Sequence, residues 1–188
     1  KNKGQMITYR LADSLPQEVL KTAWSACGSP AEQIQKRKMI EGFLDKGYGS
    51  CLLKHPEAAK IVIENWLYFD QKNYDLIAFV VMPNHVHLLI KTYDNKTLSQ
   101  IVHSWKSYTS KELGKLLKKI NADEPSALPG GNLPSNANAD EPFALPGKSK
   151  VWQEDFNDRF IRDQNHFNKV IDYIHNNPQK AGLITEVN

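Results

Sequence analysis

The sequence has few of the features that mark secreted, membrane or cysteine-ligated metal proteins. Its 188 residues include only two cysteines, Cys27 and Cys51, too few for a disulfide framework and without the spacing of a metal-binding pair. We therefore expect reduced thiols and a cytoplasmic protein. No apolar run approaches the roughly 18 to 20 residues that cross a bilayer, and no secretory signal is visible, so no membrane partner is expected.

A strong charge of either sign is also lacking. The formal net charge is +3, which permits a polyanionic partner without requiring one. Any argument for nucleic-acid binding must therefore rest on where the positive charges lie. The length allows one domain with a substantial core, and we expect a single domain over residues 1–188.

The alternation of β-rich and amphipathic segments predicts an α+β fold. Strands are expected at residues 5–11, 74–82, 85–92 and 158–162. Helices are expected from Pro16 to about residue 25, and over residues 30–46, 55–71, 97–120 and 165–177, with Pro178 ending the last one. The second and third strands are joined too closely for a crossover and should form an antiparallel hairpin. This order predicts a ferredoxin-like sandwich, with helices covering one face of a mostly antiparallel sheet of about four strands.

One segment stands outside this pattern. "NADEPSALPG" at residue 121 recurs as "NADEPFALPG" at residue 138, with Asn, Pro and Gly between the copies. Two copies are too few for a solenoid, which needs at least three stacked repeats. We expect a flexible Pro/Gly-rich surface insertion at about residues 121–150 that is dispensable for folding.

Two histidines lie in an otherwise apolar stretch, "VVMPNHVHLLI". Because side chains alternate along a strand, His85 and His87 share one face with Leu89, while Val86 and Leu88 share the other. Two imidazoles on one face of a strand can bind the same metal ion. They also fit as polar residues on a partly solvated sheet face, and two ligands alone do not complete a site.

The C-terminal helix carries two more polar candidates. Tyr173 and Asn177 are one helical turn apart, on a flank of the apolar stripe that contains Val170 and Ile174. An asparagine oxygen could complete a two-histidine metal site, and a phenol beside the metal could act as a nucleophile. Taken alone, Tyr173 is better explained as a half-buried aromatic at the edge of the apolar stripe.

Five blocks of the sequence together resemble the REP-associated tyrosine transposases, the single-tyrosine branch of the HUH endonuclease superfamily. The blocks are "ITYRLADSLPQ", "VVMPNHVHLLI", "SWKSYTSKEL", "VWQEDFNDRFIRD" and "HFNKVIDYIHNNPQKAGLI". The likeness runs from about residue 7 to the end of the chain and is interrupted by the insertion at about residues 121–150.

The resemblance implies roles for particular residues. His85 and His87 match the two histidines of the HUH signature, Tyr173 matches the catalytic tyrosine, and Asn177 matches the third metal ligand. The implied function is a metal-dependent endonuclease and strand transferase that forms a 5′-phosphotyrosine on single-stranded, hairpin-containing DNA. Mg²⁺ or Mn²⁺ is the implied cofactor, since two imidazoles and an amide oxygen leave open positions for water and phosphate.

The resemblance also implies a bacterial, nucleoid-associated protein that acts as a monomer or a homodimer. The alternative function is a module of the same fold that recognises repeated palindromic DNA with little or no catalysis. Retention of both histidines, Tyr173 and Asn177 favours the enzyme, because binding alone does not need this set.

Several basic and aromatic residues are candidates for DNA contact. The lysines of the helix over residues 97–120 line one side of it, which fits either phosphate binding or a solvated surface. A tryptophan near the insertion could stack on an unpaired base or fill the core. The candidates are Lys106, Lys111, Lys115, Arg159, Arg162 and Trp152.

Overall fold

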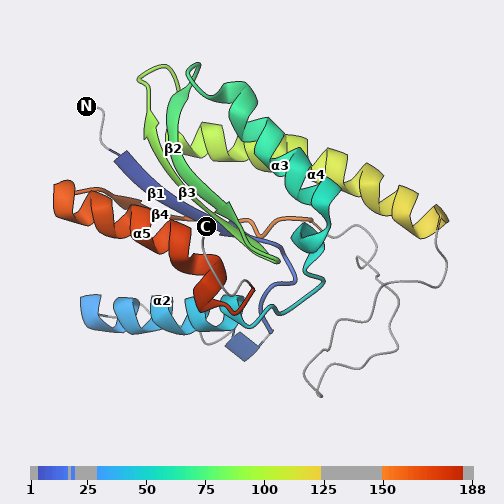
Figure 1. The fold of residues 1–188 in the computed structure, drawn as a ribbon, viewed down its shortest axis with the longest axis horizontal. Coiled ribbons are helices and arrows are strands. Elements are labelled where there is room, and N and C mark those ends of the chain that lie inside the picture. The colour runs from blue at the N-terminus through green and yellow to red at the C-terminus, as the bar shows by residue number, and fades with distance from the viewer. Residues whose placement is uncertain (1–3, 17, 20–28, 124–149, 184–188) are drawn as a thin grey trace.

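Four short strands, the first three of them rich in apolar residues, form one antiparallel sheet. The computed structural model describes residues 4–16, 18–19, 29–123 and 150–183 (Figure 1). The strands are β1 (Gly4–Arg10), β2 (Tyr74–Val81), β3 (His85–Thr92) and β4 (Asn157–Phe160). They lie in the order β2-β3-β1-β4, and every neighbouring pair is antiparallel. This confirms the predicted α+β fold with a four-stranded sheet and the predicted β2–β3 hairpin.

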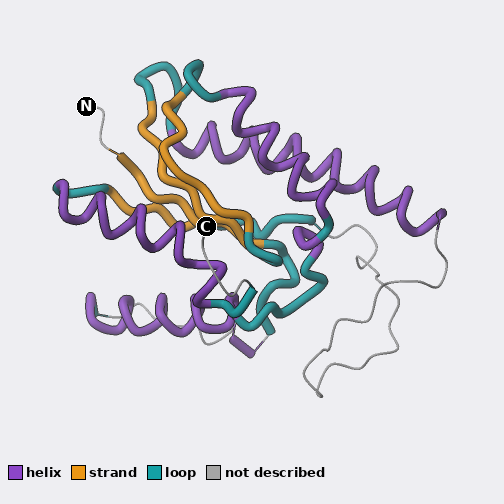
Figure 2. The backbone as a smooth tube through the Cα atoms, in the orientation of Figure 1, coloured by secondary structure: helices purple, strands orange, loops and turns teal. Residues whose placement is uncertain are grey.

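Helices lie on both sides of this sheet (Figure 2). The helices in the described residues are α2 (Pro30–Asp45), α3 (Pro56–Phe69), α4 (Leu98–Asp123) and α5 (Gln164–Lys180), with a short 3₁₀ turn at Leu52–Lys54. Every one of them is too short or too polar for a membrane span. The predicted helix from Pro16 to about residue 25 falls mostly outside the described residues, as do Cys27 and residues 124–149 of the expected insertion.

The expectation that helices cover only one face of the sheet was wrong. One face carries Val86 and Leu88 and packs against α3 and α4. The other face carries Leu89, which packs against Val170 and Ile174 of α5. Because β3 is an interior strand with apolar residues on both faces, each face needs its own cover. We call the second face, which also carries His85 and His87, the histidine face.

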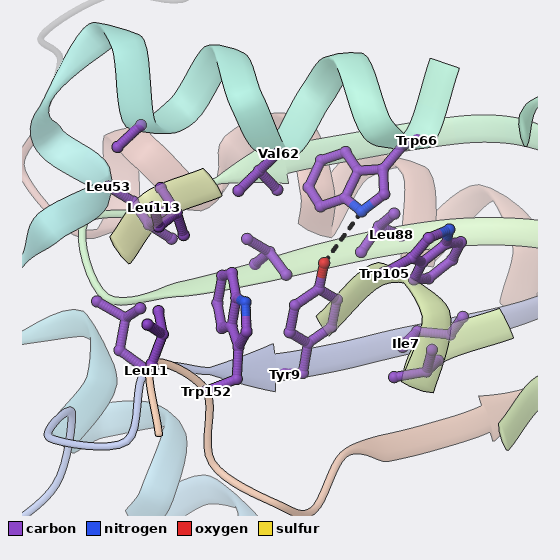
Figure 3. Close-up of a cluster of buried hydrophobic side chains, with 14 of the residues drawn as sticks. Ile7, Tyr9, Leu11, Leu53, Val62, Trp66, Leu88, Trp105, Leu113 and Trp152 are labelled. Carbon is purple, nitrogen blue, oxygen red and sulfur yellow. Dashed lines mark hydrogen bonds between the residues drawn. The ribbon is translucent and has the colours of Figure 1, made fainter. Parts of the chain in front are cut away.

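The first face is held by tryptophan and tyrosine side chains whose polar atoms are paired (Figure 3). Trp66 Nε1 donates to Tyr9 Oη at 3.0 Å, and Trp105 Nε1 donates to Tyr74 Oη at 3.1 Å. Tyr74 Oη in turn donates to the Trp66 carbonyl at 2.7 Å. These bonds join α3 and α4 to β1 and β2 without leaving the buried polar atoms of these rings unpaired.

Helix α5 continues beyond the proline that was expected to end it. Pro178 lies inside the helix, which runs to Lys180. A proline removes one backbone donor, but here the Ala181 N–H still donates to the Asn177 carbonyl at 3.0 Å and the Leu183 N–H to the Pro178 carbonyl at 2.9 Å. The chain then turns away at Gly182, whose φ of 68° suits a helix C-terminus. Asn177 is therefore held in regular helix, one turn after Tyr173.

Candidate active site

The two histidines lie at the start of β3, directly after the turn at Pro83 and Asn84. Both side chains are on the histidine face and each residue is only 1% exposed. Their Nε2 atoms are 3.1 Å apart, and the two rings are inclined at 81°. Two ligands bonded at about 2.1 Å to one ion can be at most about 4.2 Å apart, so this spacing allows both Nε2 atoms to bind the same ion.

The outward-facing Nδ1 atoms are also engaged. His85 Nδ1 lies 2.8 Å from Asn84 Oδ1, and His87 Nδ1 lies 2.7 Å from Thr8 Oγ1. The pairing of β1 with β3 places Thr8 directly opposite His87. Metal-binding histidines are commonly oriented by such partners on the second ring nitrogen.

Burial decides the protonation state of both rings. Desolvation lowers the pKa of His87 to about 3, and it lowers the pKa of His85 well below its usual value, helped by the adjacent His87. Both imidazoles are therefore neutral at pH 7. A neutral imidazole is the form that binds a metal ion.

Helix α5 brings Tyr173 to this pair. The helix begins at its N-cap Asp163, which accepts from the His166 N–H at 2.8 Å, and its apolar residues pack on β2 and β3. Tyr173 Oη lies 3.4 Å from His87 Nε2, with the two ring centres 5.2 Å apart. The tyrosine and both histidines belong to one chain, so no second copy is needed to assemble them.

The environment of Tyr173 opposes ionisation of its phenol. Burial raises the pKa of the phenol well above its usual value, and the carboxylates of Glu41 and Asp45 on α2 raise it further. The phenolate therefore needs an additional positive charge nearby at neutral pH.

Asn177 supplies a third polar atom. The residue is 2% exposed, and within the described residues its Oδ1 has no hydrogen-bond partner. A buried, unpaired amide oxygen is costly and needs an explanation. In the described part of the chain, no three side chains of histidine, cysteine, aspartate or glutamate gather into a metal site. The two imidazoles and the Asn177 oxygen, however, fit the donor set of a divalent ion.

The candidate DNA contacts are distributed unevenly around this cluster. Arg159 is exposed on β4 opposite Met6, on the histidine face, and its charge acts on Tyr173. Arg162 is exposed just before α5, roughly three helical turns ahead of Tyr173. Lys111 and Lys115 are exposed on α4, which covers the opposite face, and Lys115 Nζ is 2.8 Å from Glu112.

The structure assigns other roles to Lys106 and Trp152. Lys106 Nζ donates to the carbonyls of Gln153, Glu154 and Asp155 at 2.8–3.1 Å, which uses all three of its N–H groups. Burial also lowers the pKa of this ammonium to about 8. Trp152 is 3% exposed and donates from Nε1 to Thr109 at 2.8 Å. Lys106 therefore anchors the segment before β4, and Trp152 fills the core; in this conformation neither is free for DNA.

Replacing Lys106 with methionine should lower the free energy of unfolding by about 1.5–3 kcal/mol, because three carbonyls lose a charged donor. The Lys118→Met variant removes an exposed lysine of the same helix and should stay within about 0.5 kcal/mol of wild type. Urea unfolding measures both. Equal effects of the two substitutions would contradict an anchoring role for Lys106.

Sequence reasoning missed Thr8 and Asn84. Asn84 directly precedes His85, so its position in the motif was a usable signal. Thr8 is almost eighty residues from His87, and only the β1–β3 register reveals that they are neighbours.

Comparisons with known proteins agree with this fold. Residues 54–125 match the family model described as "Transposase IS200 like"; this segment contains the histidine pair but neither Tyr173 nor Asn177. A solved structure of a REP-associated tyrosine transposase bound to a REP hairpin is similar over 100% of this chain and 73% of its own, with a TM-score of 0.51 and 15% identity. At that identity the likeness establishes the fold.

A second crystal structure, described as a candidate transposase from Deinococcus radiodurans, covers 94% of this chain and 92% of its own, at 12% identity and a TM-score of 0.37. Among curated proteins, no sequence matches the chain. The family match thus relates residues 54–125 to IS200-like transposases, and the solved structure shows a shared fold.

Proposed function

We propose that this chain, with its IS200-like transposase segment and its REP-transposase fold, is a metal-dependent endonuclease and strand transferase acting on single-stranded DNA that contains hairpins. The observation that carries the proposal is the position of Tyr173 Oη, 3.4 Å from His87 Nε2, together with the buried, unpaired oxygen of Asn177 one helical turn further along α5. A phenol from α5 and two imidazoles from β3 thus lie together, and a buried amide oxygen follows the phenol by one helical turn.

His85, His87 and Asn177 would hold the ion, which suits Mg²⁺ or Mn²⁺. When bound, a divalent ion supplies positive charge that stabilises the phosphate and the developing charge on the leaving oxygen. Tyr173 Oη forms a bond to phosphorus while the bond from phosphorus to the 3′-oxygen breaks. The phenol proton is lost to solvent, and a proton from solvent ends on the 3′-oxygen. The products are a 5′-phosphotyrosine and a free 3′-hydroxyl.

The covalent link preserves the energy of the phosphodiester bond. A 3′-hydroxyl can therefore attack the phosphotyrosine, release the Tyr173 phenol and rejoin DNA strands without ATP. This reversal makes strand transfer, rather than simple cleavage, the function proposed here.

One observation favours the alternative of a binding module with weak catalysis. The pKa of the Tyr173 phenol is raised well above its usual value, so the attacking phenolate is scarce at neutral pH. Recognition of DNA alone, however, gives no reason to bury two imidazoles and an amide oxygen beside a phenol.

The deciding experiment incubates the protein with labelled hairpin DNA and Mn²⁺. An SDS-resistant protein–DNA adduct that requires the metal, disappears with EDTA and maps to the peptide containing Tyr173 supports the enzyme. Tight binding of the hairpin with no adduct under Mg²⁺, Mn²⁺, Co²⁺ or Zn²⁺ would establish the binding module instead.

Arg159 is the better-placed candidate for contact with the DNA strand near Tyr173. The Arg159→Gln variant should weaken binding several-fold and make the slope of log affinity against log salt shallower by about 0.7, as expected for one lost phosphate contact to a single strand. Lys115→Gln makes the same charge change on the opposite face and should alter the slope less. Fluorescence anisotropy over a salt series measures both slopes. A larger change of slope for Lys115→Gln than for Arg159→Gln would show that the DNA binds along α4 instead.

A further inference from the structure

A chain of four hydrogen bonds links the Tyr48 carbonyl to Thr8 through Asn84 and both histidines. It begins at Asn84, whose Nδ2 donates to the Tyr48 carbonyl at 2.8 Å. A carbonyl can only accept, so this bond fixes the orientation of the Asn84 amide. The Asn84 oxygen must therefore face His85 Nδ1, at 2.8 Å.

The orientation of Asn84 fixes the proton on His85. An amide oxygen only accepts, so His85 Nδ1 must carry a proton and donate it. The ring is only 1% exposed, and an imidazole so removed from water is neutral, so it has one proton and its Nε2 is a bare acceptor. The lone pair of His85 Nε2 then points at His87 Nε2, 3.1 Å away.

The same reasoning continues to Thr8. Two bare nitrogens would repel at 3.1 Å, so without metal the proton of His87 must lie on Nε2 and be donated to His85. His87 Nδ1 is then bare and accepts a hydrogen bond from the Thr8 hydroxyl at 2.7 Å. At every contact in the chain, one group then donates a proton and its neighbour accepts the hydrogen bond.

This arrangement cannot bind a metal ion as it stands, because the proton on His87 Nε2 occupies the lone pair that the ion needs. We propose that Thr8 is a positioning residue that sets the tautomer of His87 and permits it to change. In the metal-free protein the Thr8 hydroxyl donates to His87 Nδ1. When a divalent cation binds, the His87 proton moves from Nε2 to Nδ1, and Nδ1–H then donates a hydrogen bond to Thr8 Oγ1. This proposal rests on the metal site of the proposed function.

A hydroxyl suits this position because it can both donate and accept. The His87 ring keeps one proton throughout, so the change of tautomer releases none. His85 needs no such change, since Asn84 already holds its proton on Nδ1 and leaves Nε2 bare. The two ligands are thus prepared differently: Asn84 fixes one, and Thr8 allows the other to switch.

Long-range ¹H–¹⁵N NMR on protein labelled in histidine tests the metal-free state directly, with His87→Gln used to assign the signals. We expect His85 protonated on Nδ1 and His87 protonated on Nε2. Addition of Zn²⁺, a diamagnetic probe, should move the His87 proton to Nδ1 and leave that of His85 in place. A metal-free His87 already protonated on Nδ1, or a His87 tautomer unchanged by Zn²⁺, overturns the proposal.

Two variants of Thr8 test its part in metal binding. Thr8→Val keeps the shape but removes the hydroxyl, and it should weaken Mn²⁺ affinity by about 10- to 100-fold. Thr8→Ser keeps the hydroxyl and should stay within about threefold of wild type. Calorimetric titration with Mn²⁺ measures affinity, and circular dichroism checks that each variant is folded. Wild-type affinity in Thr8→Val, equal losses in both variants, or a wild type that binds no Mn²⁺ would each overturn the proposal.

These measurements use no DNA, so they separate the inference from the proposed function. If the protein shows the tautomer change and the Thr8 effect but never forms a DNA adduct, the metal site is supported and the transferase function is contradicted. If the DNA adduct forms but His87 is the Nδ1–H tautomer with and without metal, the transferase is supported and the role proposed for Thr8 is contradicted.

Discussion

The Tyr173→Phe variant should form no detectable SDS-resistant adduct with hairpin DNA, a loss of at least about 1,000-fold in rate. Phenylalanine removes only Oη, the atom that would bond to phosphorus. The other hydroxyl beside His87, that of Thr8, lies at Nδ1 and not at the Nε2 that Tyr173 faces. The ring contact with His87 and the packing of α5 on the sheet do not involve Oη. Hairpin affinity should therefore stay within about threefold of wild type, measured by anisotropy in the same buffer.

The matched control is Tyr68→Phe. Tyr68 is 63% exposed at the end of α3, on the side of the sheet away from the histidine face, and it should form the adduct at the wild-type rate. A residual adduct in Tyr173→Phe that maps to another residue would show that the nucleophile has been misassigned. Loss of both adduct and hairpin binding would indicate damage to the fold rather than to the chemistry.

Alternation along β3 was predictable because it depends only on local geometry. Side chains two apart share a face of a strand, and the structure places His85, His87 and Leu89 on one face and Val86 and Leu88 on the other. The pairing of Tyr173 with Asn177 followed in the same way from the 3.6-residue period of a helix. Both inferences needed no knowledge of how the elements pack.

Relations that depend on packing were missed. The histidine face has a helical cover because Leu89 and Ala78 need one, yet polar His85 and His87 made that face look partly solvated. Thr8 bonds to His87, 79 residues away, and Lys106 bonds to carbonyls that begin 47 residues away at Gln153. No local sequence pattern indicates either bond. Pro178 was read by its usual effect on helices, but α5 continues to Lys180, and the Ala181 N–H still donates to the Asn177 carbonyl beyond the proline.

The same separation of faces predicts which substitutions damage the fold and which damage the chemistry. The groups proposed for catalysis and metal binding all lie on the histidine face or on α5 above it. The paired tryptophan and tyrosine side chains lie on the other face. Large losses of stability should therefore come from residues that the proposed reaction never touches.

Trp105→Ala is the strongest case and should lower the free energy of unfolding by about 3–5 kcal/mol. Trp105 is fully buried, packs edge-on against Tyr74 with ring centres 5.1 Å apart, and donates to Tyr74 Oη at 3.1 Å. The truncation removes this ring from the contact between α4 and the sheet. Because domains are stable by only about 5–15 kcal/mol, the variant should be measurable by urea unfolding but close to the limit of folding.

Tyr108→Ala, three residues further along α4, is the matched control: its side chain is 52% exposed, and the change should be within about 0.5 kcal/mol. The decisive comparison is adduct formation per folded molecule, which should be unchanged in Trp105→Ala because His85, His87 and Tyr173 lie across the sheet from α4. If the folded Trp105→Ala protein loses the expected stability but also forms less adduct per molecule, the two faces of the sheet are coupled. The most direct route is through Tyr9 and Thr8, which are adjacent on β1 and face opposite sides of the sheet.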